Sequence, residues 1–239
     1  MPRLTGALRR TPHRRATRPD PLDPAWEALA PQGFHARCGR RALGLLLTLL
    51  GLPLAVLIAL PLVLLCALEH GPRGVLFTQL RVGWRGRTFR LLKFRTLRAG
   101  AEEARASRLG RFLRRTHLDE LPQLFNVLRG DMDLIGPRPE TIAIDAWARA
   151  HVPGFHRRNA VRPGLTGLAQ LTQGYAAPEA RAYARKLALD LCSLQQVTPW
   201  SDLGLLARTV PWMLSGRGAR EHGRAELASA RHPRRGATR

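Results

Sequence analysis

Residues 42–68 read ALGLLLTLLGLPLAVLIALPLVLLCAL, an apolar run of 27 residues without a charged side chain. About 20 apolar residues are enough for a helix to cross the hydrocarbon core of a bilayer, so the run is long enough for a membrane segment. The alternative is a buried core helix, but a core helix of this length would carry a polar stripe. We therefore expect residues 37–69 to form a membrane helix.

Two features indicate that this helix enters and leaves the membrane on the same side. Pro53 and Pro61 lie inside the run, and each removes a backbone hydrogen bond and bends a helix. Arginines flank the run on both sides, and positively charged flanks favour the cytoplasm. A single crossing cannot keep both flanks there, whereas a re-entrant helix–break–helix can. The residues alone leave open which proline makes the break.

Composition restricts the classes of partner. The 239 residues include 39 Lys and Arg against 17 Asp and Glu, which gives a net charge of +22. This charge predicts an acidic partner, such as nucleic acid, anionic lipid or a phosphorylated substrate. The cations are almost all arginine, which binds phosphate in a bidentate manner but which a GC-rich genome also encodes by default. Three distant cysteines predict neither a disulfide framework nor a zinc site.

The rest of the chain is expected to form two basic flexible tails, at 1–36 and 215–239, around one cytosolic domain at 70–214. That domain is predicted to be mainly α with a small β-hairpin, since aromatic and β-branched residues at 75–95 flank a glycine turn. Helices are expected at 101–115, 121–129, 141–151, 178–196 and 200–214. The last one carries Trp200 and Trp212, which fit either a membrane surface or core packing.

The densest set of functional groups lies in residues 111–140, RFLRRTHLDELPQLFNVLRGDMDLIGPRPE. Asp119 and Glu120 precede Pro122, a residue that suits the first turn of a helix. A helix N-terminus attracts phosphate and keeps carboxylates ionised, so we expect both acids to have a low pKa. That suits a nucleophile or an Mg²⁺ ligand better than a general acid, although an ordinary N-cap fits the local pattern too. His117 is interpreted as a bystander.

Short basic motifs accompany the two acids. The prolines of GPRP at 136–139 hold the backbone around Arg138, which suits either a phosphate clamp or an exposed turn. Arg162 precedes two glycines in RPGLTG at 162–167, and Lys93 and Arg95 end the predicted hairpin. Each motif alone is weak evidence. The sequence contains no Walker A, dinucleotide-binding, zinc-protease or nucleophile-elbow motif.

Taken in this order, the segments resemble the bacterial sugar transferases, monotopic phosphoglycosyl transferases that act on polyprenyl phosphate. The resemblance covers about residues 42–214, and its most specific part is LDELPQLFNVLRGDMDLIGPRP at 118–139. The other matching stretches are VLFTQLRVG at 75–83, LLKFRTLR at 91–98, VRPGLTGLAQL at 161–171 and KLALDL…SDLGLLARTV at 186–210. The resemblance implies a small catalytic-core form with a re-entrant helix, broken at Pro61 or alternatively Pro53, and interfacial amphipathic helices.

Such enzymes transfer a sugar-1-phosphate from a UDP-sugar to polyprenyl (undecaprenyl) phosphate and release UMP. This is the first membrane step of exopolysaccharide, capsule, O-antigen or glycoconjugate synthesis. The resemblance implies that Asp119 forms a covalent phosphosugar intermediate and that Glu120 binds Mg²⁺. The basic motifs and the resemblance together give the candidate substrate ligands Lys93, Arg95, Arg114, Arg138, Arg162 and Gln170.

The implied location is the bacterial inner membrane, with the catalytic domain on the cytoplasmic face. The implied partners are the two substrates, membrane lipid and downstream glycosyltransferases, without nucleic acid. The chain departs from the family at Arg73, after Gln170 and at Cys192, which affects sugar choice or packing rather than reaction type. The alternative is a membrane-anchored basic adaptor or nucleic-acid-binding protein, which would have no use for the Asp119–Glu120 pair.

Overall fold

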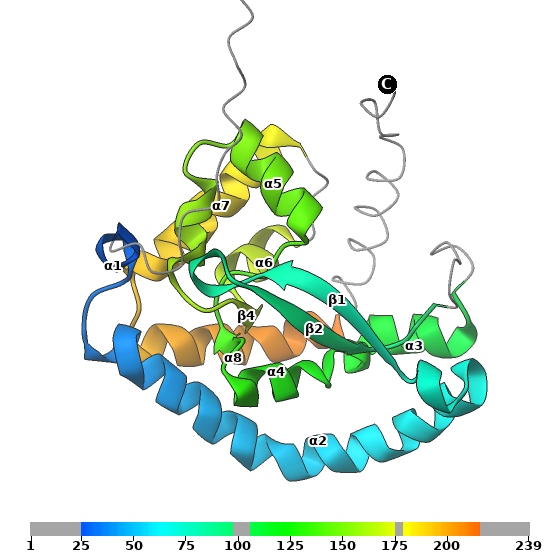
Figure 1. Ribbon diagram of the computed structural model, residues 1–239. Helices are drawn as coiled ribbons and strands as arrows, with labels where there is room; N and C mark the ends of the chain where they lie inside the picture. Colours follow the sequence, from blue (N-terminus) through cyan, green and yellow to red (C-terminus); the bar gives the residue numbers. More distant parts are fainter. Residues whose placement is uncertain (1–24, 98–105, 175–178, 216–239) are drawn as a thin grey trace, which may run out of the picture.

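The computed structural model describes residues 25–97, 106–174 and 179–215. The fold is mainly helical with a small antiparallel hairpin, as predicted. The long helix α2 (Arg40–His70) lies along one side, and α4 (Gln123–Arg129) and α8 (Pro199–Leu214) lie next to it (Figure 1). Helices α5 (Ile142–His151) and α7 (Ala180–Gln195) lie on the other side of the hairpin. The hairpin and α4 therefore separate the long apolar helix from the α5–α7 unit.

Helix α2 does not break. It continues through Pro53 and Pro61 and curves, with its convex side turned away from the rest of the protein (Figure 1). The predicted break at Pro61, or at Pro53, is therefore wrong. A proline inside a helix removes one hydrogen bond and bends the axis. The leucine-rich neighbours have a high helix propensity, so the helix continues beyond the proline.

The fold leaves most of α2 uncovered, and it is long and apolar enough to cross a membrane. Eight of its leucines are more than half exposed: Leu46, Leu49, Leu50, Leu54, Leu57, Leu60, Leu64 and Leu68. This excludes a buried core helix. An apolar surface of this extent marks contact with lipid or with another protein.

Both ends of α2 are fastened to the domain. Near its start, Arg41 donates hydrogen bonds to the carbonyls of Val127 and Met132 at 2.7 and 2.8 Å, and Arg40 pairs with the buried Asp202 of α8 at 2.6 Å. Near its end, Leu62 and Cys66 pack with Phe94 and Leu113 in a small core. The middle of the helix is therefore the part that projects.

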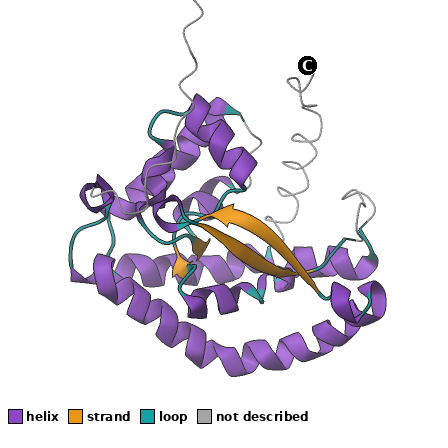
Figure 2. Ribbon diagram, in the orientation of Figure 1, coloured by secondary structure: helices purple, strands orange, loops and turns teal. Residues whose placement is uncertain are grey.

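Two small sheets position the loops between the helices (Figure 2). Strands β1 (Leu76–Val82) and β2 (Thr88–Phe94) form the predicted hairpin, closed by the turn at Trp84–Gly86. Strands β3 (Asp133–Ile135) and β4 (Gly164–Thr166) pair in parallel. The sequence did not predict this second sheet because each strand has only three residues, too few to show an alternating pattern.

The remaining helices agree well with expectation. Predicted helices are confirmed at α4, α5, α7 and α8, while the expected 101–115 helix is described only from Arg108, as α3 (Arg108–Thr116). The short helix α6 (Leu168–Gln173) was not predicted. Part of the expected N-terminal tail is folded, since α1 (Ala25–Leu29) buries Trp26 against His156. Residues 1–24 and 216–239 lie outside the described residues.

Candidate active site

The two adjacent acids sit on a short turn, Leu118–Glu120, between α3 and α4. His117 ends α3 in the left-handed conformation, with φ of 56°, and this sharp change of direction turns the acids inward. Both are buried, with Asp119 6% and Glu120 8% exposed. Pro122 is the residue before α4, so the acids precede a helix N-terminus, as predicted.

Glu120 is held by two cations from different elements. Arg138 binds it in a bidentate manner, with Nη2 2.6 Å from Oε1 and Nη1 3.2 Å from Oε2, and Lys93 Nζ of strand β2 lies 2.8 Å from Oε1. Burial raises the pKa of Glu120, but Arg138 and Lys93 outweigh it and bring the pKa well below its usual range. Glu120 is thus ionised, as expected.

Asp119 differs from its neighbour. Burial raises its pKa, and Lys93 opposes this from 3.6 Å, while the charge of Glu120 raises the pKa again. The result is a raised pKa, so the expectation of a low value is wrong for Asp119. The reason is that Lys93 makes its shorter contact with Glu120, so Asp119 has less compensation for burial. A carboxylate with a raised pKa is more basic and, once deprotonated, a stronger nucleophile.

The structure brings four of the six candidate substrate ligands to these acids. Lys93 and Arg138 contact Glu120 directly. The charge of Arg114 acts on Asp119, while its Nε donates to Thr96 Oγ1 at 2.8 Å. Gln170 lines the same cavity as Glu120 and Arg138.

The other two candidates are engaged elsewhere. Strand β2 ends at Phe94, so Arg95 leaves the alternation of the sheet and its Nε donates to the carbonyl of Gly74 at 2.9 Å. The guanidinium of Arg162 lies 4.5 Å from the ring centroid of Trp84, and its Nε donates to the carbonyl of Gly130 at 3.1 Å. Both arginines make contacts within the chain here, and no contact joins either of them to the acids among the described residues, so their role as substrate ligands stays a prediction.

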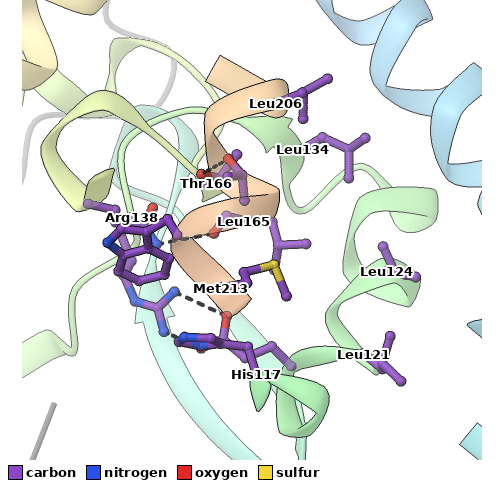
Figure 3. A pocket seen from close by; sticks show the side chains of 13 residues that line it. His117, Leu121, Leu124, Leu134, Arg138, Leu165, Thr166, Leu206 and Met213 are labelled. Carbon is purple, nitrogen blue, oxygen red and sulfur yellow. Dashed lines mark hydrogen bonds and ion pairs between the residues drawn. The ribbon is translucent and has the colours of Figure 1, made fainter. Parts of the chain in front are cut away.

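A cavity of about 140 Å³ lies beside Glu120 and Arg138 (Figure 3). His117 lines it and stacks on Trp212 of α8, with ring centroids 5.1 Å apart. His117 was interpreted as a bystander and Trp212 as an interface or core residue, so the sequence missed both as site residues. Their signal was weak because only the folded chain brings α8 next to the turn that carries the acids.

A second buried network supports the backbone of Arg138. Arg158, which is 1% exposed, donates from Nη2 to the Arg138 carbonyl at 2.8 Å and from Nε to Asp190 at 2.7 Å. Glu140, next to the same loop, pairs with Lys186 of α7. The loop itself passes close to β4, since a Cβ on Gly136 would lie 2.8 Å from the backbone nitrogen of Gly164. These contacts fix where the Arg138 guanidinium is presented.

The donor set restricts how a metal could bind. No group of three or more His, Cys, Asp or Glu side chains comes together in the described parts of the chain. Asp119 and Glu120 offer two carboxylates, and Mg²⁺ typically binds through one or two carboxylates with substrate phosphates completing its shell. The residues therefore fit Mg²⁺ shared with a phosphate ligand.

Comparison with known proteins gives one family. The family model described as bacterial sugar transferase matches residues 35–216. A Caulobacter vibrioides protein named UDP-glucose:undecaprenyl-phosphate glucose-1-phosphate transferase is 41% identical over 71% of this chain and 66% of its own length. An Aeromonas hydrophila protein named UDP-N-acetylgalactosamine-undecaprenyl-phosphate N-acetylgalactosaminephosphotransferase is 37% identical over 76% of this chain and 45% of its own. The chain thus spans less than two thirds of either relative.

Proposed function

The chain belongs to the bacterial sugar transferase family, and on that premise we propose that it transfers a sugar-1-phosphate from a UDP-sugar to undecaprenyl phosphate, releasing UMP. The observation that carries this proposal is the buried Asp119–Glu120 pair with Lys93 and Arg138 around it. The relatives' names give the same class of reaction. Cations around an acid pair favour the attack of a carboxylate on a diphosphate, because they reduce the repulsion between the two anions.

In this proposal Asp119 is the nucleophile. A carboxylate oxygen of Asp119 attacks the β-phosphorus of the UDP-sugar, the bond from that phosphorus to the bridging oxygen breaks, and UMP leaves with the electron pair. A phosphate oxygen of undecaprenyl phosphate then attacks the phosphorus of the phosphosugar–Asp intermediate. The Asp119–phosphorus bond breaks, and the carboxylate is restored.

The cations reduce the main electrostatic barrier to this reaction. A carboxylate approaching a diphosphate meets anion–anion repulsion, which fixed positive charges reduce in the transition state. Lys93, Arg114 and Arg138 lie on different elements that converge on the acids, so they can contact different phosphate oxygens.

Glu120 would hold Mg²⁺ together with the substrate phosphates. When bound, Mg²⁺ supplies positive charge that stabilises the departing UMP phosphate. Chelation with EDTA is expected to abolish UMP release, and added Mg²⁺ to restore it.

We also propose that α2 is re-entrant and that the catalytic domain lies on the cytoplasmic face. Three observations support this: the fastened ends of α2, its curved and uncovered middle (Figure 1), and the arginines on both flanks. Re-entry would place the acids near the lipid headgroups, where the acceptor presents its phosphate.

The test is UMP release by nanodisc-held protein with undecaprenyl phosphate and a panel of UDP-sugars that begins with UDP-glucose and UDP-N-acetylgalactosamine. We expect release that requires both the lipid and one of the sugars, and that disappears in Asp119→Asn. Folded, membrane-bound protein that releases no UMP from any sugar of the panel would contradict the proposal.

A further inference from the structure

The cavity beside Glu120 is polar at one end and apolar along its walls. Its apolar lining includes Leu121, just before α4, and Leu124 of α4, which lie across the space from Leu165 of β4 and Met213 of α8 (Figure 3). The lining also includes Leu134 and Leu206. Charged side chains enter only through Glu120 and Arg138. A ligand matched to this space has an apolar body and a charged head.

Two buried polar atoms at this cavity also call for a ligand. His117 Nε2 and Gln170 Oε1 have no hydrogen-bond partner among the described residues, although their side chains are only 9% and 7% exposed. Buried polar atoms in folded proteins almost always have a partner. Both residues line the cavity, so an oxygen of a bound head group could accept a hydrogen bond from the His117 ring N–H, and a bridging water could donate one to Gln170 Oε1.

The apolar walls lead from the acids toward the membrane helix. Leu134 lies against α2, since a Cβ on Gly44 would be 3.7 Å from its backbone nitrogen. In Figure 3, α2 lies beyond Leu134 and Leu206 as seen from Arg138. A lipid could thus run from the acids past these leucines to the exposed face of α2.

We propose that this cavity holds the phosphate-proximal part of the acceptor's prenyl chain, with the phosphate at Arg138 and His117. The inference rests on the proposed function. A UDP-sugar has no hydrocarbon chain to place along the leucine walls, so a prenyl chain fits this lining better. The negative head fits Arg138, the cation among the residues that line the cavity.

The size of the cavity limits how much of the chain it takes. An apolar cavity of about 150 Å³ in another protein binds benzene, which has six carbons. At about 140 Å³ this cavity holds roughly one five-carbon isoprene unit, and the remaining units lie in the bilayer. Short prenyl phosphates should therefore bind as the long ones do once both reach the site.

The first experiment measures binding without requiring activity. Purified protein in detergent is titrated with farnesyl phosphate, and thermal stabilisation is compared with that by farnesol and by inorganic phosphate. Leu206→Trp fills the cavity, and Val210→Trp is the matched control because Val210 is 59% exposed on the same helix. We expect farnesyl phosphate to stabilise the wild type and Val210→Trp, with affinity at least tenfold weaker in Leu206→Trp. Equal affinity in all three proteins would overturn the inference.

The phosphate contact is tested separately with His117→Phe, which keeps an aromatic ring against Trp212 but removes the ring N–H. This variant should weaken farnesyl phosphate binding several-fold and leave the much weaker binding of farnesol unchanged. Stabilisation of the wild type by farnesol or by an ordinary phospholipid as strongly as by farnesyl phosphate would show a general lipid site and contradict the assignment.

Kinetics then separate this inference from the proposed function. In Leu206→Trp we expect the KM for undecaprenyl phosphate to rise at least tenfold, while the KM for the UDP-sugar changes less than threefold. An equal rise in both values would show general damage to the site and would overturn the inference. A wild type that binds farnesyl phosphate but releases no UMP would contradict the proposed function alone.

Discussion

Two buried clusters of charge lie about the same loop, and they differ in how completely each charge is compensated. In the Glu140 cluster (Glu140, Lys186, Arg158 and Asp190), Glu140 pairs with Lys186 and Arg158 with Asp190. Burial raises the pKa of Glu140, but the charges of Lys186 and Arg158 lower this pKa by more than burial raises it. The net shift is therefore downward. Burial lowers the pKa of Arg158 and its acidic partners reverse this. Each of these two groups is therefore held in its charged form.

The Glu120 cluster (Asp119, Glu120, Lys93 and Arg138) is compensated only in part. Glu120 receives the shorter contacts of both cations, whereas the pKa of Asp119 is raised against its ionised form. A cavity with two unpartnered polar atoms, among the residues described, adjoins this cluster. This difference in charge compensation indicates that the Glu140 cluster stabilises the fold and that the Glu120 cluster is arranged for a substrate. Active sites often contain groups that destabilise the free enzyme.

The largest expected effect belongs to Asp119. Asp119→Asn should lower transfer by about 10⁴-fold or more, as loss of a nucleophile does in other enzymes. The same change should keep or raise the unfolding temperature, because a neutral amide replaces a carboxylate whose ionised form is disfavoured by burial. Activity assays and thermal unfolding on one preparation check both results. A clear fall in the unfolding temperature would show that Asp119 stabilises the fold, as the Glu140 cluster does.

Glu140→Gln should show the opposite pattern. It leaves Lys186 and Arg158 buried with one acidic partner fewer, and breaking a buried pair typically costs about 3–5 kcal/mol. Chemical denaturation of the variant measures this loss. Glu27→Gln is the control, because Glu27 is largely exposed where it pairs with Arg85 and should cost under about 1 kcal/mol. If Glu140→Gln unfolds like the control, the two clusters do not differ as described.

Arg138→Lys tests the bidentate contact between Arg138 and Glu120. Lysine keeps the charge but loses one of two parallel hydrogen bonds, so kcat/KM for the UDP-sugar should fall roughly 10- to 100-fold. Arg162→Lys serves as the comparison, since Arg162 contacts Trp84 and Gly130, and its activity should change less than threefold. A larger loss of activity in Arg162→Lys would show that Arg162 contributes to the active site.

The smallest effect concerns pH. The raised pKa of Asp119 means that protonation favours the folded state, so its unfavourable contribution is present at neutral pH and fades as pH falls through its folded pKa. The unfolding temperatures of wild type and Asp119→Asn should therefore differ at pH 7 and converge in acid. Glu140, with its lowered pKa, contributes stability above about pH 4.3 that is lost as pH falls through its folded pKa. A difference that stays constant with pH would contradict the raised pKa.

The sequence predicted the elements whose information is local. The apolar run of α2, the glycine turn of the hairpin and the Asp119–Glu120–Pro122 order are each contained in a short stretch, and each is confirmed. The raised pKa of Asp119 was not predictable, because it depends on burial and on how Lys93 divides its contacts between two acids.

The other errors have the same origin. The contacts of Arg95 and Arg162 were missed because their carbonyl partners, Gly74 and Gly130, are distant in sequence from the arginines. The cavity was missed because its leucines on α4 and α8 have the spacing of ordinary core residues. Whether proline ends a helix depends on its neighbours, which is why α2 continues through Pro53 and Pro61.

The nucleophile is tested most directly by mass spectrometry of the intact protein after brief incubation with the accepted UDP-sugar and Mg²⁺, without acceptor lipid. We expect a mass increase of one sugar phosphate, located by peptide mapping to Asp119, absent from Asp119→Asn and discharged by undecaprenyl phosphate. Lipid-dependent UMP release that persists in Asp119→Asn, with no adduct on the wild type, would contradict the assignment of Asp119.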